Sequence, residues 1–237
     1  FGAFFFLQLC ARAYARYSYI LKEEIALDEL KRKFEDVFRL YQLNYERIFD
    51  VLYPAKNNTG FTERNLSVNF CKAYESLHPE AISWYEFQFG AKNNLHYDAV
   101  IINPTKNEVL LIESKRFSHP KKKIAGVYSD IARINDVMSS YCKEFMERIY
   151  HCSGASVYGV ILADVWTQTK RKTEIWDTFK RGAFITRMLP EGYGVPTLPD
   201  CTYFVNEFPD VKRAAVIRDD YKLLSLVWKV GNFPSNV

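Results

Sequence analysis

Two apolar runs separated by a short turn constrain the fold of this chain more than any other part of the sequence. The runs span residues 95–103 and 108–114, and the turn between them has Pro104 and Asn107. Short apolar runs bounded by Asn and Pro predict two strands joined as a hairpin. Each run nevertheless contains an acidic residue, Asp98 in the first and Glu113 near the end of the second. Burying a carboxylate in an apolar strand is costly unless a partner compensates its charge, so both residues indicate a functional site.

Alternation along these strands indicates which side chains meet. Residues two apart on a strand project from the same face, so Glu113 and Lys115 share a face, and pairing of the strands brings Asp98 close to Glu113. Two adjacent carboxylates resist ionising together, and a hard divalent cation resolves that conflict. We therefore expect Mg²⁺ (or Mn²⁺), because Mg²⁺ takes oxygen ligands and is commonly held by one or two carboxylates plus a substrate phosphate.

Three further groups are candidates for the same site. The backbone carbonyl of Ser114 is a candidate oxygen ligand, and Lys115 is a candidate to orient the attacking water or to stabilise charge on a phosphate. Glu63 falls on the same helical stripe as Leu66, which makes it a candidate third carboxylate. Glu86 on the preceding strand competes for that role, and Glu63 is also compatible with a first-turn acid favoured by the helix dipole.

The order of elements between residues 62 and 165 is expected to be helix, three strands, helix, strand. On the second of these helices, residues 128, 131, 134 and 137 are expected core positions, and spacing alone does not show whether Arg133 faces a substrate. The expected elements are an amphipathic helix over 27–53, a helix from 62, strands over 82–89, 95–103 and 108–114, a basic loop at 119–123, a helix over 124–150, a strand over 155–165, a helix over 172–183 and strands over 202–208 and 223–230.

This combination of motif and element order resembles the PD-(D/E)xK nucleases. Their pattern is an acidic residue on one strand, followed at the end of the next strand by an acidic residue, any residue and a lysine. Asp98 matches the first position, and Glu113-Ser114-Lys115 matches the second. The family core has the same order of helix, three strands, helix and strand. The proline of the family name is absent, since Tyr97 precedes Asp98.

The resemblance implies an α/β protein with a restriction-endonuclease-like core, in which a small mixed sheet is flanked by helices. The expected division is a helical N-terminal region at 1–58, the core at 59–166, and a C-terminal extension packed on the core at 167–237. The resemblance also implies a Mg²⁺-dependent nuclease that hydrolyses phosphodiester bonds, with DNA as the expected nucleic acid. Many members carry a glutamate on the first core helix, and Glu63 resembles that residue.

Other interpretations of the same residues stay open. Glu113 and Lys115 are compatible with a strand-end salt bridge, and Asp98 with a buried acid that the backbone or His96 satisfies. The fold is also compatible with a non-catalytic nucleic-acid-binding or assembly module. Three other acidic-x-lysine triplets occur, at 29–31, 210–212 and 220–222, but we find an apolar strand with an acidic neighbour only before 113–115.

Composition narrows the classes of protein that fit. The chain is 48% hydrophobic and 25% charged, which is typical of a globular protein, and its net charge of +4 permits an anionic partner without requiring one. Five cysteines with no CxxC pair favour a reducing compartment, so a cytoplasmic location is expected. The apolar run at 1–11 is too short to span a bilayer and is better explained as a truncated start or a packed helix than as a signal peptide. No membrane partner is expected, and a homodimer is left open.

Overall fold

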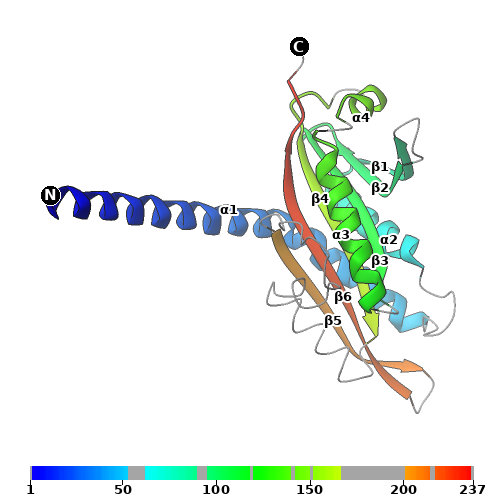
Figure 1. The fold of residues 1–237 in the computed structure, drawn as a ribbon. Helices are drawn as coiled ribbons and strands as arrows, with labels where there is room; N and C mark the ends of the chain where they lie inside the picture. Colours follow the sequence, from blue (N-terminus) through cyan, green and yellow to red (C-terminus); the bar gives the residue numbers. More distant parts are fainter. Residues whose placement is uncertain are drawn as a thin grey trace.

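The computed structural model describes residues 2–52, 62–89, 95–117, 120–139, 142–149, 152–166, 201–213 and 217–235. The side chains of residues 2–24, 26, 95, 120–125, 166, 210, 212–213 and 217–220 lie outside that description. The helices in this part of the chain (Figure 1) are α1 (Gly2–Val51), α2 (Glu63–Leu77), α3 (Pro120–Asp136) and α4 (Cys142–Arg148). The strands are β1 (Ile82–Phe89), β2 (Leu95–Asn103), β3 (Glu108–Arg116), β4 (Ser156–Trp166), β5 (Cys201–Arg213) and β6 (Ile217–Asn232). The helix expected over 172–183 lies outside the described residues.

The strands form one six-stranded mixed sheet in the order β1-β2-β3-β4-β6-β5. Antiparallel pairing joins β1 to β2 and β2 to β3, whereas β3 and β4 run parallel. A parallel pair needs a crossover connection, and the segment carrying α3 and α4 supplies it. β6 returns antiparallel to β4 and pairs with β5 at the edge. The predicted α/β class with a mixed sheet is therefore confirmed, and β5 and β6 make the sheet larger than the four strands expected for the core.

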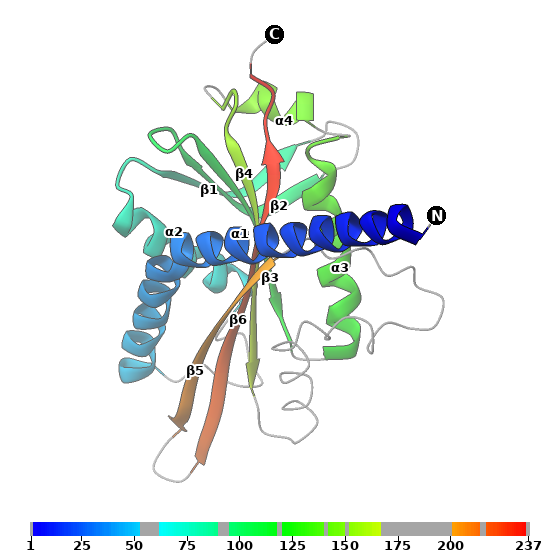
Figure 2. The same ribbon diagram turned by 90° about the vertical axis from the view of Figure 1, so that its left-hand side faces the viewer.

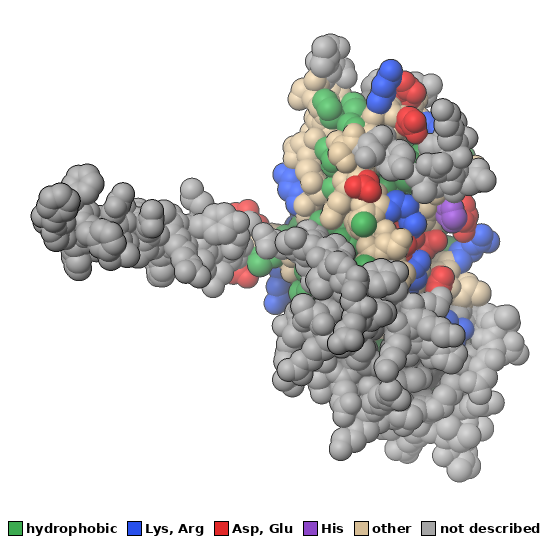
Figure 3. Space-filling view, in the orientation of Figure 1, with side chains coloured by type: hydrophobic (Ala, Val, Ile, Leu, Met, Phe, Trp, Pro, Cys, Tyr) green, Lys and Arg blue, Asp and Glu red, His purple; other side chains and the backbone are tan. Residues whose placement is uncertain are grey.

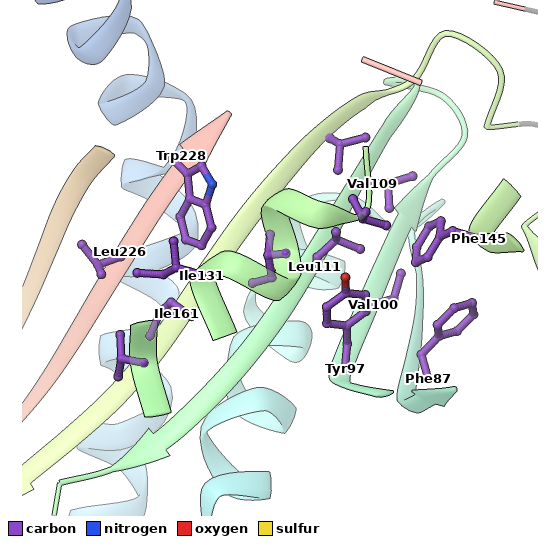
Figure 4. Packing of buried hydrophobic residues seen from close by; sticks show 14 of the residues in the cluster. Phe87, Tyr97, Val100, Val109, Leu111, Ile131, Phe145, Ile161, Leu226 and Trp228 are labelled. Carbon is purple, nitrogen blue, oxygen red and sulfur yellow. The ribbon is translucent and has the colours of Figure 1, made fainter. Parts of the chain in front are cut away.

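Helices cover both faces of the sheet (Figures 1 and 2). Alternate residues of β2 and β3 divide between two buried apolar clusters, because successive side chains on a strand point to opposite faces. Ala99 and Ile112 belong to the cluster that contains residues of α1 and α2. Val100 and Leu111 belong to the cluster that contains residues of α3 and α4. Figure 4 shows α3 lying on this second face, with Ile131 close to the strands.

The helix α1 confirms the amphipathic pattern expected over 27–53, although it begins at Gly2. The aromatic residues Phe34, Phe38, Tyr41 and Tyr45 recur three or four positions apart and are all buried. Phe38 stacks on Phe204 of β5 with ring centroids 4.1 Å apart, so this stripe attaches α1 to the C-terminal strands. None of the helices, as far as their residues are described, offers a stretch apolar and long enough to cross a bilayer.

The single helix expected over 124–150 is wrong, because two helices, α3 and α4, occupy that segment. α3 begins at Pro120, a residue suited to the first helical position because its missing N–H would have no helical partner there. Residues 121–123 therefore belong to the helix and not to a loop. After Asp136 the backbone tightens, and the N–H of Val137 donates to the carbonyl of Ile134, three residues back. The expected core positions are confirmed, because residues 128, 131 and 134 on α3 and residue 137 just after it are all buried.

Candidate active site

Asp98 and Glu113 come next to each other through the pairing of β2 with β3. The paired register ends at Ala99 and Ile112, so Asp98 and Glu113 are the next residue on each strand. The backbone N–H of Ser114 donates to Asp98 Oδ2 at 2.6 Å, which shows that the Asp98 side chain reaches across to β3. The charge of Asp98 also raises the pKa of Glu113, so the two carboxyl groups interact electrostatically.

At Asp98 the regular alternation of side chains between the two faces of the sheet is interrupted, which the sequence pattern does not predict. The β1–β2 pairing runs from Tyr85 with Ala99 to Phe87 with Tyr97 and omits Glu86 and Asp98 between them. Residues two apart on a strand normally share a face. Here Tyr85 and Ala99 pack with the α1–α2 cluster, whereas Phe87 and Tyr97 pack with the α3–α4 cluster.

The backbone of Glu86 accounts for this change of face. Its φ of 52° lies in the left-handed region, which residues other than glycine seldom adopt. Glu86 and Asp98 lie opposite each other at the irregularity, and both side chains line one cleft.

That cleft has a volume of about 430 Å³, and its lining includes both candidates for the third carboxylate. Glu63 Oε1 accepts a hydrogen bond from the backbone N–H of Arg116 at 2.9 Å, which ties the start of α2 to the end of β3. Glu86 pairs with Arg64 at 3.1 Å and lies 3.8 Å from His96. The cleft is lined by Thr62, Glu63, Arg64, Glu86, His96 and Asp98.

Burial and crowded negative charge oppose ionisation of the two central carboxyl groups. Burial is the main reason why the pKa of Asp98 is raised, and the charges of Glu63 and Glu86 add to it. The pKa of Glu113 is raised to about 8, mainly by burial and then by the charges of Asp130 and Asp98. A positive charge between these two carboxyl groups would favour their ionised forms and so lower both pKa values.

Two residues of α3, Asp130 and Arg133, connect the motif side chains, and we call this pair the α3 bridge. Arg133 forms an ion pair with Glu113 and a second one, at 2.8 Å, with Asp130 Oδ1. Lys115 Nζ lies 2.7 Å from Asp130 Oδ2. Burial lowers the pKa of Lys115, but the charge and hydrogen bond of Asp130, together with the charges of Glu113 and Asp98, outweigh burial and raise the pKa overall, so Lys115 stays an ammonium. A chain of ion pairs therefore connects Glu113 to Lys115 through the α3 bridge.

Ser114 and Arg116 point to the other face of β3 and anchor the strand end. The hydroxyl groups of Ser114 and Ser67 of α2 are 2.7 Å apart in a buried hydrogen bond. Arg116 Nε lies 3.9 Å from Asp164 Oδ2, and the same oxygen accepts a hydrogen bond from Tyr221 at 3.0 Å. Asp164 is buried, and its burial raises the pKa of its carboxyl to about 6.

Sequence reasoning missed Asp130 and Asp164. Asp130 stands three residues before Arg133 on an otherwise apolar helical stripe, a spacing at which oppositely charged side chains meet. Asp164 ends an apolar strand in the same way as Glu113 does. Acidic residues at the ends of apolar runs were therefore the signal that could have identified Asp164.

The donor chemistry fits a hard divalent cation, because Asp98 and Glu113 offer carboxylate oxygens, and the pKa values of both groups are raised in the absence of a cation. In this conformation Glu113 engages Arg133, and Asp98 engages the Ser114 backbone. Across the described ranges, no three His, Cys, Asp or Glu side chains are grouped closely enough to hold one ion. Figure 3 shows positive and negative side chains interspersed over the described part of one face, without a continuous basic surface.

Comparisons with known proteins gave no match, so the functional conclusion depends on the geometry of the site. No protein-family model, no curated protein and no solved structure matches the chain.

Proposed function

We propose that this protein is a divalent-metal-dependent nuclease that hydrolyses phosphodiester bonds, with DNA as its substrate. The observation that carries the proposal is the adjacent position of Asp98 and Glu113 at the end of the β2–β3 pairing, with Lys115 and Glu113 both paired to residues of α3. The proposed fold is a restriction-endonuclease-like core made of α2, β1, β2, β3, α3 and β4. Its support is the order of these elements and the placement of α2 and α3 against opposite faces of the sheet.

In this proposal Asp98 and Glu113 hold the cation, with the Ser114 carbonyl and Glu63 as further oxygen donors. Bound Mg²⁺ or Mn²⁺ supplies Lewis-acid activation of the phosphodiester and a water of lowered pKa. Lys115 remains protonated through its contact with Asp130, so it provides positive charge for a phosphate oxygen or an attacking water. The Arg116 N–H holds Glu63 at the edge of the cleft.

Cleavage of supercoiled plasmid DNA with Mg²⁺ or Mn²⁺ tests the proposal. We expect Asp98→Asn and Lys115→Met to lower the cleavage rate by at least about 100-fold, because each removes a group that interacts with the transition state. Asp36→Asn is the matched control, since Asp36 is exposed on α1 and pairs only with Arg39 in the described contacts. Equal cleavage by all four proteins would reject the assignment.

Comparing Glu63→Gln with Glu86→Gln in the same cleavage assay identifies which of the two residues is the third carboxylate. Both side chains line the cleft beside Asp98, but Glu63 is fixed to β3 by the Arg116 N–H, whereas Glu86 pairs with the exposed Arg64. We expect the Glu63 variant to lose more activity. A larger loss for the Glu86 variant would transfer the role to Glu86.

A second candidate function is a non-catalytic nucleic-acid-binding or assembly module. The α3 bridge favours it, because Arg133 and Asp130 compensate Glu113 and Lys115 without any cation. Titration with MnCl₂ separates the two functions. Binding that is lost in Asp98→Asn supports the nuclease, and absence of binding supports the module.

A further inference from the structure

The α3 bridge places a permanent cation on a carboxylate of the candidate metal site. Arg133 Nη2 donates to Glu113 and also to Asp130 Oδ1 at 2.8 Å. The side chains of Glu113 and Arg133 are only 3% and 24% exposed. In such a poorly solvated setting a nearby positive charge acts strongly on any second cation.

We propose that Arg133 is an internal counter-ion that competes with the divalent cation for Glu113 and thereby sets the metal affinity of the site. This inference rests on the proposed function. Arg133 occupies Oε1 of Glu113, so a cation that uses this oxygen must displace the guanidinium. Arg133 also repels a divalent ion placed between Asp98 and Glu113, and both effects weaken metal binding.

The surroundings of Arg133 allow this exchange without leaving a buried charge unpaired. Asp130 retains its own hydrogen bond to the guanidinium when Glu113 is released. The Tyr97 ring provides a second contact, with its centroid 6.0 Å from Arg133 Cζ. An unpaired buried charge would be strongly destabilising, so these two contacts make displacement from Glu113 feasible.

Neutral substitutions of Arg133 test the inference through Mn²⁺ affinity, measured by the electron paramagnetic resonance signal of free Mn²⁺ during titration with MnCl₂. We expect Arg133→Gln and Arg133→Met to bind Mn²⁺ about tenfold more tightly than the unmodified protein, a coupling of ordinary size between two bound charges. Arg133→Lys retains the charge and is expected to bind within about twofold of the unmodified protein. Arg39→Gln is the matched control, because it removes an exposed arginine from α1 and leaves the affinity unchanged.

The outcomes separate this inference from the proposed function. Tighter binding of Mn²⁺ by the neutral variants than by the unmodified protein supports the inference. Equal or weaker binding by the neutral variants overturns the inference and leaves the nuclease in place. Absence of binding by every protein overturns both proposals. Failure of both neutral variants to fold, with and without MnCl₂, assigns Arg133 a structural role and also overturns the inference.

Discussion

Glu113 is expected to destabilise the folded protein at alkaline pH when no divalent cation is present. Its side chain is 3% exposed, and burial raises its pKa from an ordinary value of 4.5 to about 8, with the charges of Asp130 and Asp98 contributing in the same direction. Between these two values the folded state binds more protons than the unfolded state. The free energy of unfolding therefore falls as the pH rises from 4.5 to 8.

The size of this effect follows from the pKa change. Each pKa unit corresponds to about 1.4 kcal/mol, so the loss across the interval is about 5 kcal/mol. Glu113→Gln carries no titrating group and resembles the protonated side chain in shape. The variant should therefore match the unmodified protein near pH 5 and exceed its stability by several kcal/mol at pH 9.

Guanidinium chloride unfolding in EDTA at pH 5, 7 and 9 measures this difference for both proteins. Asp164 is buried, and its pKa is raised to about 6, but it titrates in both proteins and cancels from the difference. A difference that stays constant from pH 5 to pH 9 would refute the reasoning, as would a variant that is less stable at pH 9.

Three further changes test buried contacts of the sheet. Gly159→Ala should lower the free energy of unfolding by about 3 kcal/mol in chemical denaturation, because a Cβ there would overlap the indole of Trp228, and an unchanged midpoint would contradict the packing. Lys33→Met should lower it by about 3–5 kcal/mol, since it leaves the buried Glu108 without its cation, and thermal unfolding that matches the unmodified protein would exclude this ion pair. Ser67→Ala should lower it by about 1–3 kcal/mol, because it removes the partner of a buried hydroxyl on β3, and a gain in stability measured by urea unfolding would contradict the hydrogen bond.

The part of the site that was predicted from the sequence follows from the geometry of single strands and hairpins. Alternation along a strand placed Glu113 and Lys115 on one face, and both interact with α3, as expected for a shared face. Hairpin pairing of β2 with β3 was expected from the apolar runs and the turn between them, and the structure has it.

The α3 bridge could not be predicted in the same way. Whether Asp130 and Arg133 face β3 depends on how α3 is rotated and shifted along the sheet, which only tertiary packing decides. The interrupted alternation at Asp98 was also not predicted. It depends on a left-handed backbone at Glu86, and glutamate is not a residue type that indicates this conformation. The break between α3 and α4 was missed because the apolar periodicity continues across residues 137–139.

Crystals of the protein soaked in MnCl₂ and measured at the manganese absorption edge test the central claim most directly. The account predicts an anomalous peak bound by the carboxyl groups of Asp98 and Glu113, with Arg133 displaced toward Asp130. A structure in which Arg133 remains on Glu113 and no manganese lies between the two carboxyl groups would contradict it.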